Sequence, residues 1–337
     1  MANLTIKDIA RMAGVSTTAV SFVLNGRPGV SDATRQKVQE IIHQTGFIPN
    51  VHTRRLNLGK SFTVHVVLKQ YAYGLYNQFA LETLSGVFKE GKSLGYSIIF
   101  TLIDEHMECE QILESVRSKD CDGMILNQID DPALIEQLQR EGMPFVCVDA
   151  HLSADRKLPM VEVDYCDAAY QATRYLHESG HTQIGFIGPQ TPTEHYANTF
   201  RGYQSYLEEA GLSCNPQWVA KMPFSEGSTE AAVDIMLQQE KLPTALLCSC
   251  DAVAIDVIRR AKKRGIRIPE DISVIGIDDL LVSHYLDPAL TTMTFDKELL
   301  GAKAMEVLYQ IIQGTEYESC NTISTTLVER DSVRKIG

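Results

Sequence analysis

Residues 14–26, GVSTTAVSFVLNG, decide the fold of the N-terminal segment and raise the question of what that segment binds. Ser16 is a typical helix N-cap, and apolar residues follow it at helical spacing as far as Leu24. The preceding stretch, TIKDIARMA at 5–13, has the Thr-x-x-Asp pattern of a capping box, and Gly14 can end its helix. Two short helices joined by a tight turn predict a helix-turn-helix, whose second helix reads DNA.

The pattern extends outward into a third helix and a basic connector. Ser31 can cap this helix, Val38, Ile41 and Ile42 form its apolar stripe, and Gly46 can end it. Residues 49–61, PNVHTRRLNLGKS, are polar and basic. They predict either a plain linker or a short helix that forms only under some conditions.

The charge distribution supports a nucleic-acid-binding N-terminal segment. The chain has 337 residues and a formal net charge of −12. Residues 1–60 hold eight Lys or Arg against three Asp or Glu, a charge of +5, so the remainder has −17. An acidic body repels DNA, so DNA contact is expected only through the basic head.

From residue 62 onward, apolar runs of strand length alternate with amphipathic helical stretches. The predicted strands lie at 62–68, 96–103, 123–129, 145–150, 183–188, 245–250 and 272–278. The predicted helices lie at 78–94, 108–118, 132–141, 167–179, 200–211, 228–239, 252–264 and 297–313. This alternation predicts two doubly wound α/β lobes with parallel sheets, which bind ligands at the carboxyl ends of their strands.

Several stretches resemble chemical motifs, but their context argues against the corresponding chemistry. The stretch HESGH at 177–181 matches a zinc-protease pattern, but Gly180 is expected to end the helix before His181, so no metal site is predicted. No dinucleotide, phosphate-binding or nucleophile-elbow motif occurs, and we expect neither enzymatic activity nor a cofactor. The eight cysteines form no C-x-x-C pair and are expected to be reduced. Asp149, Asp251 and Asp278 follow predicted strands, where each could bind ligand hydroxyls or equally well cap a helix.

Four stretches carry a resemblance that covers nearly the whole chain. The head at 5–50 and the segments GHTQIGFIG, RGIRIPEDISVIGIDD and YLDPALTTM resemble the lactose/galactose-repressor (LacI/GalR) family of bacterial transcriptional regulators. The resemblance implies an all-α helix-turn-helix headpiece at 1–48, a hinge helix at 49–61 and a body of the periplasmic-binding-protein type at 62–337. The body would comprise an N-lobe at about 62–161 and 293–322, and a C-lobe at about 162–292 and 323–337.

The resemblance also implies which residues contact operator DNA. Thr17, Thr18 and Phe22 match base-facing positions, and Leu56 matches a hinge leucine that wedges into the minor groove. Phe22 stands where the family often has Arg, and a Phe can make only apolar contact with a base, such as a thymine methyl. The residues that match backbone-contacting positions are Thr5, Ser16, Ser21, Asn25, Ser31, Thr34, Asn50 and Arg54.

The predicted effector site departs further from the family pattern. Asp149 and Asp278 match effector-contacting carboxylates. Thr199, Cys250 and Phe295 stand where Arg, Asn and Gln are frequent, so three hydrogen-bonding side chains are lost. Tyr71, Tyr73 and Phe224 add rings that could stack on a sugar face. This exchange favours a glycoside or an oligosaccharide over a plain hexose.

The sequence therefore predicts a DNA-binding repressor of carbohydrate-utilisation genes, controlled allosterically by a small effector held between the lobes. The predicted partners are operator DNA, a carbohydrate effector and a second copy of the chain in a homodimer. An alternative is a regulator that answers to a non-sugar effector or a protein co-repressor. A periplasmic solute-binding protein would share the body but has no use for the basic head. The chain lacks a signal-peptide pattern and a membrane-spanning run, so a cytoplasmic location is expected.

Overall fold

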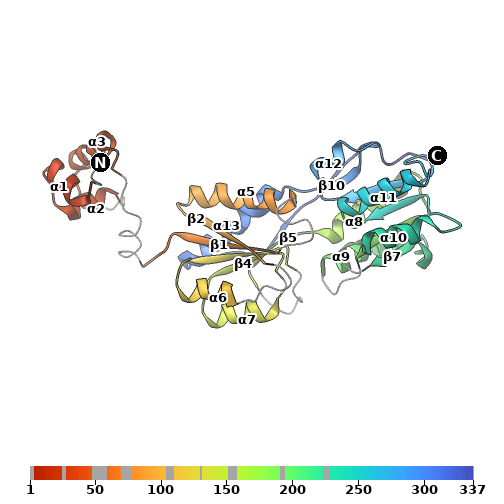
Figure 1. Cartoon of the computed structure of the whole chain (residues 1–337), viewed down its shortest axis with the longest axis horizontal. Coiled ribbons are helices and arrows are strands. Elements are labelled where there is room, and N and C mark those ends of the chain that lie inside the picture. Colours follow the sequence, from red (N-terminus) through yellow and green to blue (C-terminus); the bar gives the residue numbers. More distant parts are fainter. Residues whose placement is uncertain are drawn as a thin grey trace. The chain divides into compact units, whose positions relative to one another are not determined.

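The computed structural model describes residues 4–24, 28–47, 59–69, 78–103, 110–129, 131–150, 158–189, 194–222 and 228–336. Figure 1 traces the chain from the N-terminal head to the body. The chain divides into two compact units, Met1–Ser61 and Phe62–Gly337. Among the described residues, no helix is both long and apolar enough to cross a membrane. The predictions for Asn25 and for residues 49–58 of the predicted hinge at 49–61, which include Asn50, Arg54 and Leu56, lie outside the described residues.

The head contains the three predicted helices, α1 (Ile6–Ala13), α2 (Thr17–Leu24) and α3 (Asp32–Thr45). The capping box is confirmed, because the Asp8 carboxylate accepts hydrogen bonds from the backbone N–H and the hydroxyl of Thr5 at 3.0 and 2.6 Å. Gly14 and Gly46 end α1 and α3 in the left-handed conformation, as predicted. The core of the head consists of Ile9, Ala10, Ala13, Val20, Val23, Val38 and Phe47.

The first body sheet has six parallel strands in the order β11-β5-β4-β3-β1-β2. These are β1 (Thr63–Lys69), β2 (Ser97–Ile103), β3 (Gly123–Asn127), β4 (Phe145–Val148), β5 (Met160–Val163) and β11 (Cys320–Ile323). Helices α5 (Gln78–Ser93) and α13 (Lys297–Gln313) cover one face, and α6 (Glu110–Arg117) and α7 (Pro132–Arg140) cover the other (Figure 1). Neighbouring residues of β1 alternate between the two faces, since Val66 packs with α5 and Val67 with α6 and α7.

The second sheet has the order β12-β10-β9-β8-β6-β7, with only β12 antiparallel to its neighbour. Its strands are β6 (Ile184–Pro189), β7 (Val219–Met222), β8 (Ala245–Cys248), β9 (Ser273–Ile277), β10 (Thr291–Thr294) and β12 (Thr326–Val328). Helices α8 (Tyr165–Glu178) and α9 (Glu194–Glu209) pack on one face, and α10 (Ser228–Leu237) and α11 (Asp251–Lys263) on the other. The short helix α12 (Leu281–His284) lies between β9 and β10, and a 3₁₀ helix spans Pro216–Trp218.

The chain passes between the two lobes three times. It leaves the first sheet after β5, returns to it after β10 through α13, and leaves again after β11. Strands β11 and β12 belong to different sheets although only two residues separate them. A change in the angle between the lobes must therefore be taken up at these three short connections.

All seven predicted strands and eight predicted helices are present, with shifted ends. The largest shift is at α9, which begins at Glu194 rather than at residue 200. The sequence prediction missed β5, β7, β10, β11, β12 and α12, all of which have three or four residues. The seven described cysteines are all free, in agreement with the prediction of reduced thiols.

Candidate nucleic-acid interface and effector site

The exposed start of α2 carries the predicted base-reading residues Thr17 and Thr18. Ser16 precedes them, and its hydroxyl accepts a hydrogen bond from the backbone N–H of Ala19 at 3.1 Å. The inward side of the helix is fixed by Val20 and Val23, which are buried in the core of the head. The two threonine hydroxyls are therefore held on an anchored helix and face solvent, where a base edge could reach them.

Phe22 is half-buried, and its ring lies against the backbone of Gly29 in the loop before α3. A Cβ atom placed on Gly29 would be only 3.3 Å from Cε2 of Phe22. Gly29 has a φ of +108°, a conformation that L side chains rarely adopt. Sequence reasoning assigned Phe22 a contact with DNA and did not foresee this contact within the head.

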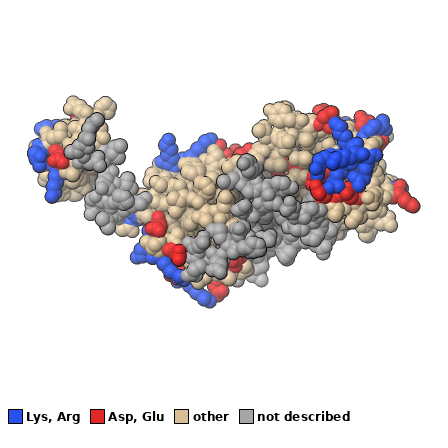
Figure 2. All heavy atoms as spheres, viewed as in Figure 1, with Lys and Arg blue, Asp and Glu red and all other residues tan. Residues whose placement is uncertain are grey.

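The predicted backbone-contacting residues lie mainly at helix N-termini. Thr5, Ser16 and Ser31 precede α1, α2 and α3, and the Ser31 hydroxyl pairs with the Thr34 hydroxyl at 2.9 Å. Such termini present unpaired N–H groups and partial positive charge, which suit a phosphate. Ser21 is half-buried in α2, whereas Asn25, Asn50, Arg54 and Leu56 lie outside the described residues. Figure 2 shows Lys and Arg side chains along one side of the head, with a smaller acidic patch among them.

In the body, Asp149 and Asp278 follow β4 and β9, one in each sheet, and both have a positive φ, 47° and 123°. Asp149 is buried, and its Oδ2 accepts hydrogen bonds from Gln128 Nε2 at 3.0 Å and from the Tyr165 hydroxyl at 3.2 Å. Gln128 follows β3, while Tyr165 begins α8 on the other lobe. The carboxylate of Asp149 thus lies where the two lobes meet.

Asp278 is half-buried on the opposite side of this junction. Burial raises the pKa of its carboxyl group well above the usual value; the negative charges of Asp251 and Asp149 add to the rise, and Lys297 opposes it. Lys297 is only 3% exposed, and its Nζ lies 4.7 Å from the centre of the Phe295 ring. The structure therefore brings Asp149, Asp278, Phe295 and Lys297 together, which we call the interlobe polar cluster.

Phe295, Thr199 and Cys250 are the other predicted effector residues that the structure describes. Phe295 is 5% exposed, and its ring contacts those of Phe79 and Tyr165 at centroid distances of 6.1 Å. Thr199 is fully buried within α9. Cys250 is the N-cap of α11, and burial raises the pKa of its thiol to about 12, so it stays protonated at neutral pH. Tyr71, Tyr73 and Phe224 lie outside the described residues.

Asp251 has a structural role rather than a role in binding ligand hydroxyls. It is fully buried, and it accepts hydrogen bonds from Leu280 N at 2.9 Å, Ser283 Oγ at 2.6 Å and Thr292 Oγ1 at 2.6 Å. A Cβ on Gly276 would lie 2.2 Å from its Oδ1, so the glycine leaves room for this carboxylate. Neither alternative taken from the sequence, ligand binding or helix capping, describes these three bonds between distant segments.

Sequence reasoning missed Gln128, Tyr165 and Lys297, which surround the two carboxylates. Only Lys297 left a signal, because a lysine at the start of a helix is unfavourable for the helix dipole. Gln128 shares with Asp149 a positive φ, of 56°, which no sequence rule assigns to a glutamine.

The HESGH stretch does not form a zinc site. His177 lies in the last turn of α8 and pairs with the Tyr206 hydroxyl at 3.0 Å. His181 lies beyond the helix, fully buried, where it pairs with Thr244 Oγ1 at 3.1 Å and Arg334 O at 3.0 Å. The described residues contain no group of three or more His, Cys, Asp or Glu able to hold a metal ion.

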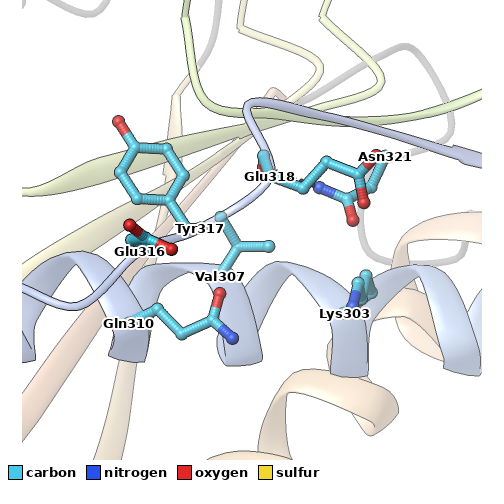
Figure 3. A pocket seen from close by; sticks show the side chains of 7 residues that line it. All are labelled: Lys303, Val307, Gln310, Glu316, Tyr317, Glu318 and Asn321. Atoms are coloured by element: carbon cyan, nitrogen blue, oxygen red, sulfur yellow. Dashed lines mark hydrogen bonds between the residues drawn. The ribbon is translucent and has the colours of Figure 1, made fainter.

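A surface hollow of about 430 Å³ lies apart from the predicted site residues. Figure 3 shows Lys303, Val307 and Gln310 on α13 facing the segment before β11. That segment contributes Glu316, Tyr317 and Glu318, and Asn321 lies in β11 itself. None of these side chains contacts the interlobe polar cluster in any described hydrogen bond or ion pair.

Comparisons with known proteins agree with this two-part architecture. Residues 5–50 match the family model "Bacterial regulatory proteins, lacI family", and residues 173–333 match "Periplasmic binding protein-like domain". The repressor PurR of Aliivibrio salmonicida is 31% identical over 98% of this chain and 99% of its own length. The repressor CytR of Escherichia coli K12 is 30% identical over 98% of this chain and 97% of its own.

Solved structures show the same arrangement of elements. The regulator CelR in complex with cellobiose has a TM-score of 0.75 and 26% identity, and the match covers 98% of this chain and 99% of that one. A lac repressor dimer bound to operator and an anti-inducer has a TM-score of 0.80 and 24% identity, over 99% and 100% of the two chains. With relatives above 30% identity over almost its entire length, the chain belongs to the lacI family of bacterial transcriptional regulators.

Proposed function

We propose that this protein is a homodimeric repressor whose affinity for operator DNA is set by a small effector bound at the interlobe polar cluster. The observation that carries the proposal is the meeting of Asp149 and Asp278, which follow strands of different lobes, at the junction of those lobes. A ligand that bridges two lobes stabilises one angle between them. By linkage, the effector and the DNA must change each other's affinity by the same factor.

Dimerisation is supported by apolar side chains that the body leaves exposed. These are Leu81 and Phe88 on α5, Ile99 and Phe100 on the edge strand β2, and Leu281, Val282 and Tyr285 at α12. Large apolar side chains that cluster on a surface mark protein–protein contact. Two joined bodies would present two heads to half-sites related by the dimer axis.

The hinge is the second part of the proposal. Leu56 would enter the minor groove between the two half-sites and unstack a central base step, as the family resemblance implies. Leu56→Ala should then weaken operator binding by about tenfold, on the order of 1.4 kcal/mol, and leave effector binding unchanged. Fluorescence anisotropy on a DNA fragment selected from a random library with the full chain measures this; equal affinity would rule out the wedge.

The effector is proposed to be a carbohydrate, with a glycoside or an oligosaccharide favoured over a free hexose. Carboxylates at strand ends can accept hydrogen bonds from sugar hydroxyls, and CelR, a structural neighbour, is described in complex with cellobiose. A thermal-shift screen with cellobiose, glucose and galactose tests the class. Tight binding of free glucose or galactose would reject the preference, and stabilisation by none of the sugars tested would favour the alternatives of a non-sugar effector or a protein co-repressor.

A further inference from the structure

One hydrogen bond joins the two lobes at the exposed rim of their junction. Gln78 is the first residue of α5 in the first lobe, and Leu281 is the first residue of α12 in the second. The Oε1 atom of Gln78 accepts a hydrogen bond from the backbone N–H of Leu281 at 2.5 Å. Since the N–H groups in the first turn of a helix have no partner within the helix, this bond satisfies a donor that would otherwise face water.

The nitrogen of the Gln78 amide is linked through Glu82 to the interlobe polar cluster. Its Nε2 donates to Glu82 Oε1 one turn along α5. The second oxygen of Glu82 lies 3.9 Å from the Nζ of Lys297, the buried lysine of the cluster. Lys297 in turn acts electrostatically on Asp278, three residues before Leu281. The charge of Lys297 thus links Asp278 to the contacts that run from Lys297 through Glu82 and Gln78 to Leu281.

We infer that Gln78 is a positioning residue that couples the interlobe polar cluster to the angle between the lobes. Its amide can accept from Leu281 and donate to Glu82 at the same time, which neither a carboxylate nor an apolar side chain can do. A change in charge or hydrogen bonding near Asp278 and Lys297 would alter the position of Glu82 and with it the interlobe bond. The bond is made only while the lobes stay at this angle, so its loss shifts the population toward other angles.

Hydrogen exchange on the full chain, without DNA or effector, tests the bond itself. Gln78→Ala should increase the exchange rate of the Leu281 amide roughly two- to tenfold, the size expected for one net hydrogen bond. Gln171→Ala is a matched control, because Gln171 also forms an exposed hydrogen bond to a carboxylate four residues away on its own helix but makes no described contact across the lobes. Equal exchange at Leu281 in wild type and Gln78→Ala would overturn the inference.

Exchanging the side chains of Gln78 and Glu82 distinguishes the loss of these specific hydrogen bonds from a general loss of structure. Gln78→Glu keeps an acceptor for Leu281 but sets two carboxylates against each other, so exchange should rise. Adding Glu82→Gln restores a donor opposite the new carboxylate, and the double variant should return to within about twofold of the wild-type rate. Failure of the double variant to recover, with both variants folded by circular dichroism, would argue for a merely structural role.

The regulatory meaning of the bond rests on the function proposed above, whereas the exchange experiment does not. Operator affinity of the effector-free protein should differ about two- to tenfold between Gln78→Ala and Gln171→Ala, measured by anisotropy on the selected DNA fragment. If the wild type binds no DNA, the proposed function fails while the exchange result stands. If the wild type binds DNA and the two variants bind it equally, the coupling role of Gln78 is wrong.

Discussion

Single buried residues decide much of the chemistry of the second lobe, and Asp251 is the clearest case. Burial raises the pKa of its carboxyl group to about 6 from an ordinary 3.8, against the opposing effect of its three hydrogen bonds. Between pH 3.8 and about 6, the folded protein therefore keeps the Asp251 proton, which the unfolded chain has already lost. This contribution to stability is present below pH 3.8 and is lost as the pH rises through 6, a fall of at most about 3 kcal/mol.

Asp251→Asn should destabilise the body by about 1–3 kcal/mol, because an amide NH₂ group would face donors at one of the two oxygen positions. The difference in unfolding free energy between wild type and variant should decrease as the pH rises from 4.5 to 7.5, since only the wild type loses the stabilising proton. Urea denaturation at the two pH values measures the gap. A gap of the same size at both would show that Asp251 is ionised throughout.

Gly29 has both a backbone conformation and a close neighbour that disfavour any residue with a Cβ atom. Gly29→Ala should destabilise the head by about 1–3 kcal/mol, because its φ of +108° is strained for alanine and the new methyl group meets the Phe22 ring at 3.3 Å. Gly46→Ala is the control, since Gly46 also has a positive φ, 63°, but nothing lies within 4 Å of its Cβ position. Thermal unfolding of the full chain, followed at the transition of the head, compares the two variants. An equal loss of stability in both would show that Phe22 has no packing role at Gly29.

For individual residues, the sequence predicted hydrogen bonds between near neighbours in the chain well and hydrogen bonds between distant segments poorly. Thr5, Asp8 and Ser31 were assigned correctly because a helix cap involves partners three residues apart. The partners of Asp251 come from residues 280, 283 and 292, and their convergence depends on three connections that no local pattern encodes.

Among the elements, the pair α5 and α13 is held by a close approach of two glycines. A Cβ on Gly86 would lie 1.9 Å from the carbonyl oxygen of Glu298, and one on Gly301 would lie 1.8 Å from that of Thr83. At each of these glycines, the absence of a side chain lets the backbones of the two helices come into contact. The second lobe repeats the device, since a Cβ on Gly202 of α9 would lie 2.0 Å from the carbonyl oxygen of Cys166 in α8.

Gly301→Ala should therefore destabilise the body by at least about 2 kcal/mol, although alanine favours helix by about 1 kcal/mol. The methyl group meets a backbone atom, which can yield only if the helices separate. Gly314→Ala, at the C-cap of the same helix with nothing within 4 Å of its Cβ position, should cost about 1 kcal/mol. Chemical denaturation decides between them, and a Gly301→Ala body as stable as wild type would show that α5 and α13 can move apart freely.

The elements that sequence reasoning found and missed differ in length and polarity. The strands it found are apolar runs, such as β9 with five buried residues. The strands it missed are short and polar, such as β10, with the sequence TTMT, and β11, with CNTI. The first two threonines of β10, Thr291 and Thr292, are buried only because other segments cover them, which is a tertiary effect.

For the whole molecule, the strongest sequence signal was the uneven distribution of charge. It separated a basic head from an acidic body, while the resemblance of the head and of three body segments correctly predicted the family. The site between the lobes was harder to predict, since Asp149 and Asp278 follow strands of different sheets and become neighbours only when the lobes meet. Thr199 and Phe295 are buried, as Asp149 is, and Cys250 is half-buried, as Asp278 is, so burial alone does not separate predicted site residues from the core.

In the proposed function, dimerisation joins the action of the head to that of the body, and the exposed apolar side chains allow a direct test. Phe88 is 42% exposed near the middle of α5, so Phe88→Glu should leave each body folded but set two carboxylates against each other in a dimer. We expect monomers at micromolar concentration in sedimentation equilibrium. Operator affinity should fall by about a hundredfold or more, because the two heads would no longer bind as one ligand.

Ile235→Glu provides the matched control. Ile235 is 62% exposed on α10, whose buried side packs with α11 on the second sheet, apart from the apolar side chains of α5, β2 and α12. This variant carries the same new charge at a similarly exposed apolar position, and it should remain dimeric with wild-type affinity for DNA. If Phe88→Glu also stays dimeric, α5 lies outside the dimer interface; if both variants dissociate, added negative charge on an already acidic body, rather than the apolar surface, controls assembly.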